Sequence, residues 1–183
     1  MHQPARQKAA LAAAACTAIA TLLYALPGQA QQPPAANPLD AIPEAMPFDV
    51  PYGAPISLDR ADALVNAAVA ESKKRNWKMN VTVVDSGGNL VAFKRMDGAQ
   101  LASIQISEHK ARAAATFRRK TRLFEDGIQR SGYNYIITLD GAIGSRGGIP
   151  LVEGGKLIGA IGCSGGTGSQ DEAVCEAAAA SLK

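Results

Sequence analysis

Two glycine-containing turns, each between short apolar runs rich in β-branched residues, constrain the fold of this chain most strongly. Glycine readily adopts the positive φ angles of tight hairpin turns. The pattern predicts two antiparallel hairpins and argues against a sheet built from parallel strands and crossover helices. The runs and their turns are residues 79–85, 86–89 and 90–95 in the first hairpin, and residues 149–152, 153–155 and 156–163 in the second.

Helices are predicted around the hairpins. Apolar residues recur every three to four positions after Ser57, which we expect to cap the first helix, and Gly132 stops the third. Ser169 and Glu172 predict a capping box for the last helix. The order predicts an antiparallel sheet of about five strands flanked by helices, an α/β chain of the α+β type. The predicted helices cover residues 58–76, 101–117, 121–130 and 169–182, and a further strand covers residues 135–138.

Residues 1–30 have the pattern of a secretory signal peptide. Arg6 and Lys8 precede an apolar stretch over residues 9–26, and small residues predict cleavage after Ala30. The alternative is an uncleaved membrane anchor, because the stretch approaches the ~17 residues that marginally span a bilayer. Cleavage is favoured, and it predicts a periplasmic or secreted protein whose mature form is not embedded in the membrane.

Prolines separate this leader from the domain that follows. Residues 31–55 hold seven of the ten prolines, which predicts an extended linker or a strap over the domain surface. The globular domain is expected to cover residues 56–183. Apolar residues alternate at the end of the strap, so we expect it to pack on a sheet edge or on a neighbouring subunit. These residues are Met46, Phe48, Val50 and Tyr52.

The charge balance argues against dedicated nucleic-acid binding. The chain has 19 basic and 16 acidic side chains, and Arg6 and Lys8 are the only charged residues of the leader. The remaining residues therefore hold 17 basic and 16 acidic side chains. Such a nearly neutral domain has no strong electrostatic attraction for a phosphate backbone.

Eleven of the 18 glycines lie within residues 141–168 and lead directly into the last predicted helix. Backbone N–H groups at a helix N-terminus favour anions such as carboxylates. An equally weighted interpretation is that these glycines allow tight turns and close helix packing. The candidate anion-binding loop consists of Gly165, Gly166, Thr167, Gly168 and Ser169.

His109 is the one histidine that follows the leader, which limits the possible chemistry. A Ser-His-Asp hydrolase also needs an exposed serine elbow that is not evident, and one His with two Cys at no recognised spacing does not form a structural zinc site. On base rates a histidine on a mixed apolar helix face is more often packed than a ligand. Cys163 and Cys175 either form a disulfide or remain separate buried thiols.

Four motifs are similar to those of the GlcG/HbpS family, which is related to the C-terminal domain of PduO proteins. The similarity covers residues 56–183. It implies a profilin-like fold, assembly into homo-oligomers that are often octamers, and haem binding, with haem degradation or iron binding in some members. The motifs are VVDSGGNL at residues 83–90, RMDGA at 95–99, GGIPL at 147–151 and GAIGCSGGTGSQDE at 159–172.

Given this resemblance, His109 is the first choice for an axial ligand of haem iron, and therefore for a metal site. Met96 and Tyr133 are weaker candidates by side-chain chemistry. Lys110 and Arg112 are expected to pair with haem propionates. The other basic residues of 118–122 are expected to form a solvated face that acids of a neighbouring subunit balance.

The expected function is an exported haem carrier, buffer or sensor, with turnover not favoured. One alternative is an enzyme that degrades haem or releases iron. The other is a haem-free oligomeric accessory module that binds a small organic acid or a partner dehydrogenase.

Overall fold

The computed structural model describes residues 37–182, in two units, residues 37–43 and 44–182, which are described separately. The first contains the 3₁₀ turn η1 (Pro38–Asp40). The expected signal peptide and its cleavage site near Ala30 lie outside the described residues. The elements of the second unit are α2 (Leu58–Lys74), β1 (Asn80–Asp85), β2 (Leu90–Arg95), α3 (Ser103–Thr116), α4 (Arg122–Ser131), η2 (Asn134–Thr138), β3 (Gly148–Glu153), β4 (Lys156–Ser164) and α5 (Gly168–Ala179).

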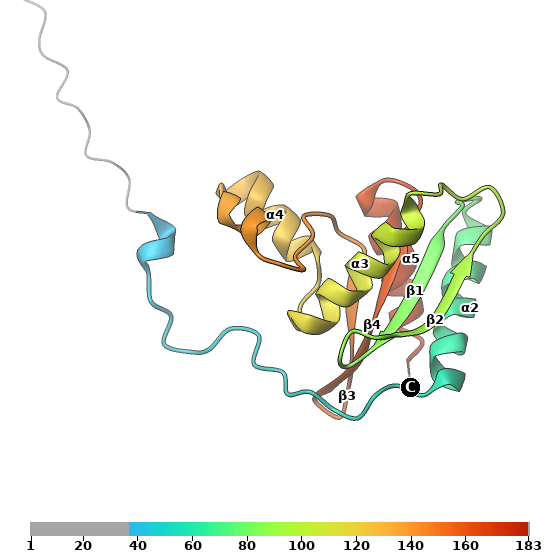
Figure 1. The fold of residues 1–183 in the computed structure, drawn as a ribbon, viewed down its shortest axis with the longest axis horizontal. Helices are drawn as coiled ribbons and strands as arrows, with labels where there is room; N and C mark the ends of the chain where they lie inside the picture. Colours follow the sequence, from blue (N-terminus) through green and yellow to red (C-terminus); the bar gives the residue numbers. More distant parts are fainter. Residues whose placement is uncertain (1–36, 183) are drawn as a thin grey trace, which may run out of the picture. The chain divides into compact units, whose positions relative to one another are not determined.

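Four strands form one antiparallel sheet in the order β2-β1-β4-β3 (Figure 1). The central strands β1 and β4 pair from Asn80 opposite Ser164 to Asp85 opposite Gly159. β2 and β3 are the edges, and each is the hairpin partner of the central strand beside it. Both predicted hairpins and the predicted antiparallel sheet flanked by helices are confirmed.

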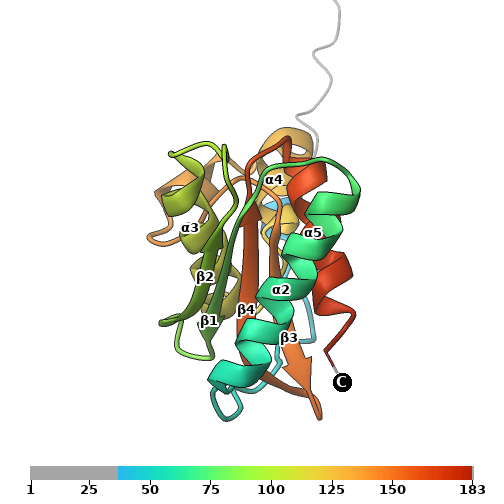
Figure 2. The same cartoon turned by 90° about the vertical axis from the view of Figure 1, so that its right-hand side faces the viewer.

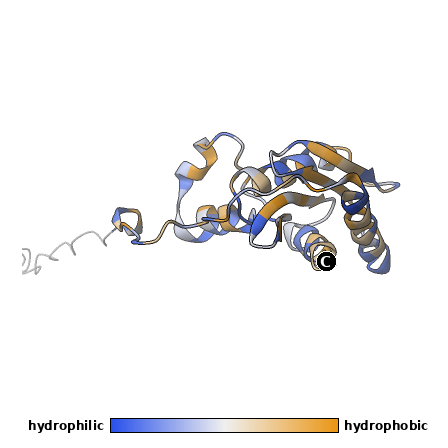
Figure 3. Cartoon of the chain, turned by 90° about the horizontal axis from the view of Figure 1, so that it is seen from below, coloured by the Kyte–Doolittle hydropathy of each residue, from blue (hydrophilic) through white to orange (hydrophobic). Residues whose placement is uncertain are grey.

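Helices cover both faces of this sheet (Figures 1 and 2). α2 and α5 pack together on one face, and α3 packs on the other. Apolar residues follow the strands and alternate with polar residues along the helices (Figure 3), as expected for helices that pack one side on a sheet. Within residues 37–182, no helix is both long and apolar enough to cross a membrane.

Small residues allow α3 to approach the sheet closely. A Cβ atom at Gly162 of β4 would lie 2.6 Å from the backbone nitrogen of Ala111. Ala114 and Ala115 of this helix are also fully buried. The alanine-rich sequence therefore provides a helix whose backbone can lie against a glycine of the central strand.

The end of the strap runs beside the start of β4. Tyr52 forms a parallel bridge with Leu157, and the N–H of Gly53 donates to the carbonyl oxygen of Leu157 at 2.7 Å. The Tyr52 hydroxyl donates to the carbonyl oxygen of Thr116 at 2.7 Å. The strap thus connects β4 to the C-terminal end of α3, whereas Met46 remains 79% exposed.

The prediction of a strand at residues 135–138 is wrong, because these residues lie in the 3₁₀ helix η2. The side chain of Ile136 packs where Gly127 of α4 has no Cβ, and the N–H of Tyr133 donates to the carbonyl oxygen of Gly127 at 2.9 Å. Contact with α4 therefore overrides the β-branched composition of this segment. The sheet accordingly has four strands instead of about five.

The caps of two helices also differ from expectation. The cap of α5 lies two residues before the predicted one, because the capping box joins Thr167 to Gln170 rather than Ser169 to Glu172. Ser57 occupies the N-cap position of α2, but its side chain makes no capping hydrogen bond. By contrast, Gly132 ends α4 in the left-handed conformation, as its sequence position predicts.

A disulfide joins Cys163 at the end of β4 to Cys175 in α5, with 5.7 Å between the two Cα atoms. The sequence left this pairing open. The helix folds back on the strand that precedes it, which provides the short separation that a disulfide needs. The bond therefore fixes α5 against the face of the sheet that it shares with α2.

Candidate functional site

The three residues considered as axial ligands lie in different parts of the domain. Met96 follows β2 and packs against the core beneath α2 and α5, whereas Tyr133 packs in a separate cluster with α4. His109 lies half-buried on α3, and its Nε2 is 3.2 Å from the carbonyl oxygen of Gly141. The structure does not gather them into one site.

Lys110 is not placed to meet a ligand from solvent. Its side chain is 1% exposed, and Nζ donates to Oδ2 of Asp171 at 2.7 Å and to the carbonyl oxygen of Cys163 at 3.3 Å. A buried ammonium requires such partners, because its desolvation is otherwise too costly. The expected pairing of Lys110 with a propionate is therefore replaced by an internal ion pair.

Arg112 is exposed, and Nε donates to the carbonyl oxygen of Gly88 at 3.4 Å. Its aliphatic chain lies over Gly88, whose φ is +83°. The residue therefore supports the turn between β1 and β2.

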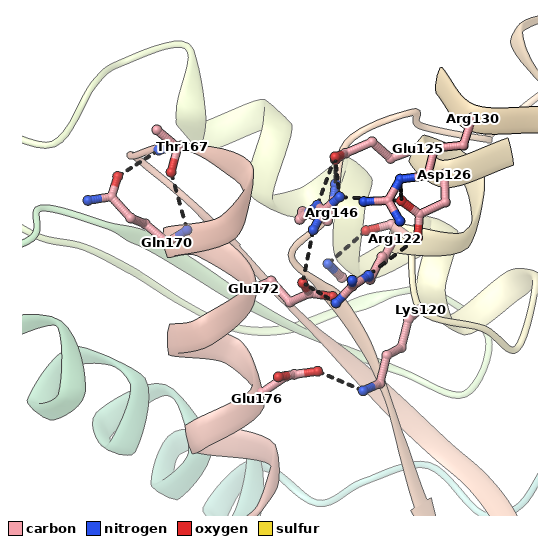
Figure 4. A network of polar contacts seen from close by, with 12 residues as sticks. Lys120, Arg122, Glu125, Asp126, Arg130, Arg146, Thr167, Gln170, Glu172 and Glu176 are labelled. Atoms are coloured by element: carbon pink, nitrogen blue, oxygen red, sulfur yellow. Dashed lines mark hydrogen bonds and ion pairs between the residues drawn. The ribbon is translucent and has the colours of Figure 1, made fainter. Parts of the chain in front are cut away.

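The basic residues of 118–122 are largely balanced within this chain. Lys120 pairs with Glu176 at 2.7 Å, and Arg122 contacts Glu172 at 3.4 Å (Figure 4). Arg118 lies 4.0 Å from Asp49 of the strap. The expectation that a neighbouring subunit balances this face is thus corrected, because the partner acids lie in α5, in α4 and in the strap.

Arg146 is the centre of this ionic network, and the sequence analysis missed it. Its guanidinium lies 2.7 Å from Glu125, 3.4 Å from Asp126 and 3.7 Å from Glu172 (Figure 4). Burial alone would raise the pKa of Glu125, but hydrogen bonds from the Arg146 side chain and backbone hold that pKa below its ordinary value. The sequence offered one signal for this role, because Arg146 is an arginine inside the glycine-rich segment of residues 141–168.

The glycine-rich loop before α5 already holds an anion of the chain. The N–H of Gly166 donates to Oδ1 of Asp171 at 3.0 Å, and the N–H of Thr167 donates to Gln170 Oε1 at 2.8 Å. Asp171 therefore joins this loop to Lys110. These donors are not available to an external anion unless the cap of α5 rearranges.

A groove of about 600 Å³ lies between the C-terminal end of α2 and strand β2, and we call it the basic groove. This volume is within the range of small-molecule pockets, roughly 300–1,000 Å³. The lining combines apolar or aromatic residues with cations. It consists of Val69, Lys73, Asn76, Trp77, Lys78, Phe93, Lys94, Arg95, Met96 and Asp97.

The end of α2 places the aromatic wall of the basic groove. Asn76 adopts a φ of +54°, which reverses the chain after the helix, and the N–H of Trp77 then donates to the carbonyl oxygen of Ser72 at 2.9 Å. Asparagine tolerates this left-handed conformation better than most residues. The guanidinium carbon of Arg75 lies 5.0 Å from the centroid of the Trp77 ring, so the indole is held between its helix and a cation.

Three cations of the basic groove have no carboxylate partner among residues 37–182, namely Lys73, Lys78 and Arg95. Lys94 donates to Oδ1 of Asn66, and Asp97 is the acid of the lining. An apolar wall beside unpaired cations suits a flat apolar ligand that carries carboxylates.

Met96 contributes a thioether to the same groove. Its sulfur lies 3.5 Å from the backbone nitrogen of Met79, and its own N–H donates to the carbonyl oxygen of Met79 at 3.0 Å. This backbone pairing fixes Met96 at the point where β2 ends. Within residues 37–182, no group of three or more His, Cys, Asp or Glu side chains is arranged to hold a metal ion.

The model of the family described as "Haem degrading protein HbpS-like" matches residues 56–180. The sequence is also similar to Protein GlcG of Escherichia coli, with 40% identity over 109 residues that cover 60% of this chain and 81% of that protein.

Two solved structures resemble the fold. A double mutant of HbpS from Streptomyces reticuli has a TM-score of 0.67 and 27% sequence identity, and the match covers 82% of this chain and 99% of that chain. The crystal structure of the PduOC–haem complex has a TM-score of 0.65 and 29% identity, over 70% of this chain and 96% of that chain.

Proposed function

Because this chain belongs to the HbpS-like family, we propose that it binds haem in the basic groove. The observation that carries the proposal is an aromatic wall beside three cations with no carboxylate partner in the described part of the chain. Haem presents the complementary surfaces, a flat apolar macrocycle and two propionates. The related PduOC protein has been crystallised with haem, which supports the ligand class.

The residues of the groove fit this group chemically. Trp77 and Phe93 offer apolar surface for the macrocycle, and Lys78 and Arg95 offer charge for the propionates. Met96 offers a thioether, a known ligand of haem iron. Bound haem would supply an iron centre that binds axial ligands and changes oxidation state.

His109 is an alternative axial ligand, because imidazole is the commonest protein ligand of haem iron. It does not line the basic groove, and its Nε2 faces the carbonyl oxygen of Gly141. A haem held by His109 would therefore lie over α3, away from the cations of the groove. Substitutions of Met96 and of His109 therefore distinguish haem binding in the basic groove from haem binding over α3.

The test is a titration of the purified protein with hemin, followed by the Soret band. The wild type should give a shifted, saturable band, and Met96→Leu, which keeps the volume but removes the sulfur, should change its position or weaken it. His109→Ala should leave it unchanged. An unshifted band in the wild type would contradict haem binding, whereas sensitivity to His109 alone would place the haem over α3.

Haem degradation is a second candidate, and one feature of the groove favours it. Among the described lining residues, Met96 is accompanied by no His, Cys or Tyr. If Met96 held the haem iron, these residues would offer it no second ligand, so the iron could bind a small molecule, which haem oxidation requires. Peroxide or ascorbate with oxygen should then remove the Soret band over many turnovers, whereas a stable band would support a carrier.

We also propose export and self-association. The leader over residues 1–30 predicts a mature protein outside the cytoplasm that begins at Gln31. Intact mass spectrometry of the protein from the periplasm or medium tests this, and an uncleaved N-terminus would contradict it. Light scattering after size exclusion tests oligomer formation, and a monomer at micromolar concentration would contradict that.

A further inference from the structure

A second cavity, of about 380 Å³, lies beside α4 and η2, and we call it the α4 cavity. Its lining includes several aromatic and aliphatic residues, among them Phe124 and Ile136 of a small buried cluster. The haem proposal does not use this cavity. It is lined by Phe48, Arg119, Leu123, Phe124, Asp126, Gly127, Arg130, Ser131, Tyr133, Tyr135, Ile136 and Leu139.

Arg119 is the cation of this lining that has no acidic partner among residues 37–182. Its Nε donates to the carbonyl oxygen of Phe117 at 3.0 Å, and within residues 37–182 its two Nη groups donate to no protein acceptor. The other charged residues of the lining, Arg130 and Asp126, form ion pairs. Arg130 lies 3.3 Å from Asp126, and Asp126 also contacts Arg122 and Arg146.

Aromatic rings surround the Arg119 guanidinium. Its central carbon lies 3.6 Å from the centroid of Phe48, 5.5 Å from that of Phe124 and 5.9 Å from that of Phe117. Burial lowers the pKa of Arg119, the nearby Tyr135 side chain raises it and the positive charge of Arg118 lowers it, and the net shift is downward. The guanidinium is thus partly removed from water without a carboxylate to balance it, which strengthens its attraction for an anion.

The strap holds Phe48 in place over this cation. Phe48 has a φ of +61°, an uncommon conformation for a residue with a bulky side chain. Arg118 donates to the carbonyl oxygen of Val50 at 3.0 Å and so fixes the strap next to it. Backbone strain of this kind persists where surrounding contacts determine the position, and it is frequent at ligand sites.

We infer that the α4 cavity binds a small apolar carboxylate, whose carboxylate group pairs with the fork of Arg119 while its apolar body lies among the aromatic residues. The two free Nη groups match a carboxylate in a bidentate pair. The volume is near the lower end of ligand pockets and suits a compact molecule.

The test is calorimetric titration of the haem-free protein with benzoate, and with benzamide as its uncharged counterpart. Benzoate should bind saturably, and benzamide should bind at least about tenfold more weakly, because it lacks the charge-assisted pair. Arg119→Met should cause a similar loss for benzoate, whereas Lys74→Met, which removes a surface cation on α2, should not. The ring resonances of Tyr133 and Tyr135 should shift during the titration.

Arg119→Met could also loosen the strap, so its thermal unfolding is measured in parallel. Arg119→Lys is the second variant, because it keeps the charge but lacks the planar fork, and benzoate should again bind more weakly. The inference is overturned if benzoate gives no saturable heat, if benzamide binds equally well, or if both folded Arg119 variants bind benzoate like the wild type. None of these outcomes depends on whether haem binds in the basic groove.

Discussion

Two regions of this protein are rich in cations but differ in how many of these cations are paired with carboxylates. Residues 110–122 hold six cations in one stretch, and four of them contact carboxylates of the same chain. The basic groove gathers its cations from α2, from the segment that follows it and from β2, and three of these have no carboxylate partner among residues 37–182. The density of cations in a sequence therefore does not show whether their charge is available to a ligand.

The largest effect is expected when the buried cation of residues 110–122 is removed. Lys110→Met should lower the free energy of unfolding by about 3–5 kcal/mol, because Asp171 would stay buried without its cation. Lys78→Met in the basic groove should change it by no more than about 0.5 kcal/mol. Urea unfolding of both variants tests the contrast, and equal effects would show that the two regions do not differ in this way.

A smaller effect is expected from the ionic network of Arg146. Glu125→Gln should lower the unfolding free energy at pH 7 by about 1–3 kcal/mol, because it weakens charge-assisted hydrogen bonds to a half-buried arginine. Unfolding in urea at neutral pH measures this loss.

The same pair predicts a pH dependence. The pKa of Glu125 is held below its ordinary value near 4.5 in the folded protein, so its contribution is fully present above about pH 4.5. That contribution is lost as the pH falls through the folded pKa. The difference in stability between wild type and Glu125→Gln should shrink over this acidic range, and a difference that stays constant down to pH 3 would contradict the assignment.

A smaller effect than that of Glu125→Gln is expected from an exposed ion pair that a cation of residues 110–122 forms. Lys120→Met should change the unfolding free energy by no more than about 1 kcal/mol, because its pair with Glu176 is about half exposed on both sides. The effect should fall further in 1 M NaCl. A loss above about 2 kcal/mol would mean that this pair supports the fold in a way that its exposure does not indicate.

Much of the fold could be predicted from local sequence. Glycine turns located both hairpins, and Gly132 located the end of α4, because these signals act over a few residues. The expected strand at residues 135–138 failed because Ile136 packs into the space above Gly127, and the cap of α5 was placed two residues too late. The first outcome depends on a tertiary contact that single-sequence patterns do not contain, whereas Thr167 and Gln170 fit the local capping-box pattern as well as Ser169 and Glu172 do.

The candidate site was less predictable for the same reason. Lys110 looked available beside His109, but it is buried against Asp171, which lies 61 residues later. The basic groove requires the end of α2 to meet the end of β2, so Lys73 and Arg95 could be connected only through the packing of these elements. The cationic end of the first helix was visible in the sequence, but nothing local indicated that it faced Met96.

Equilibrium hemin binding to two triple variants tests most directly whether the unpaired cations of the basic groove hold the carboxylates of haem. One replaces Lys73, Lys78 and Arg95 by Met, and the other replaces Arg118, Lys120 and Arg122 by Met, with folding checked for both. The groove variant should bind hemin at least about tenfold more weakly than the wild type, because charge-assisted pairs to the propionates are lost, and the other variant should bind within about twofold. Equal affinity of the groove variant and the wild type would show that these three cations do not hold the propionates.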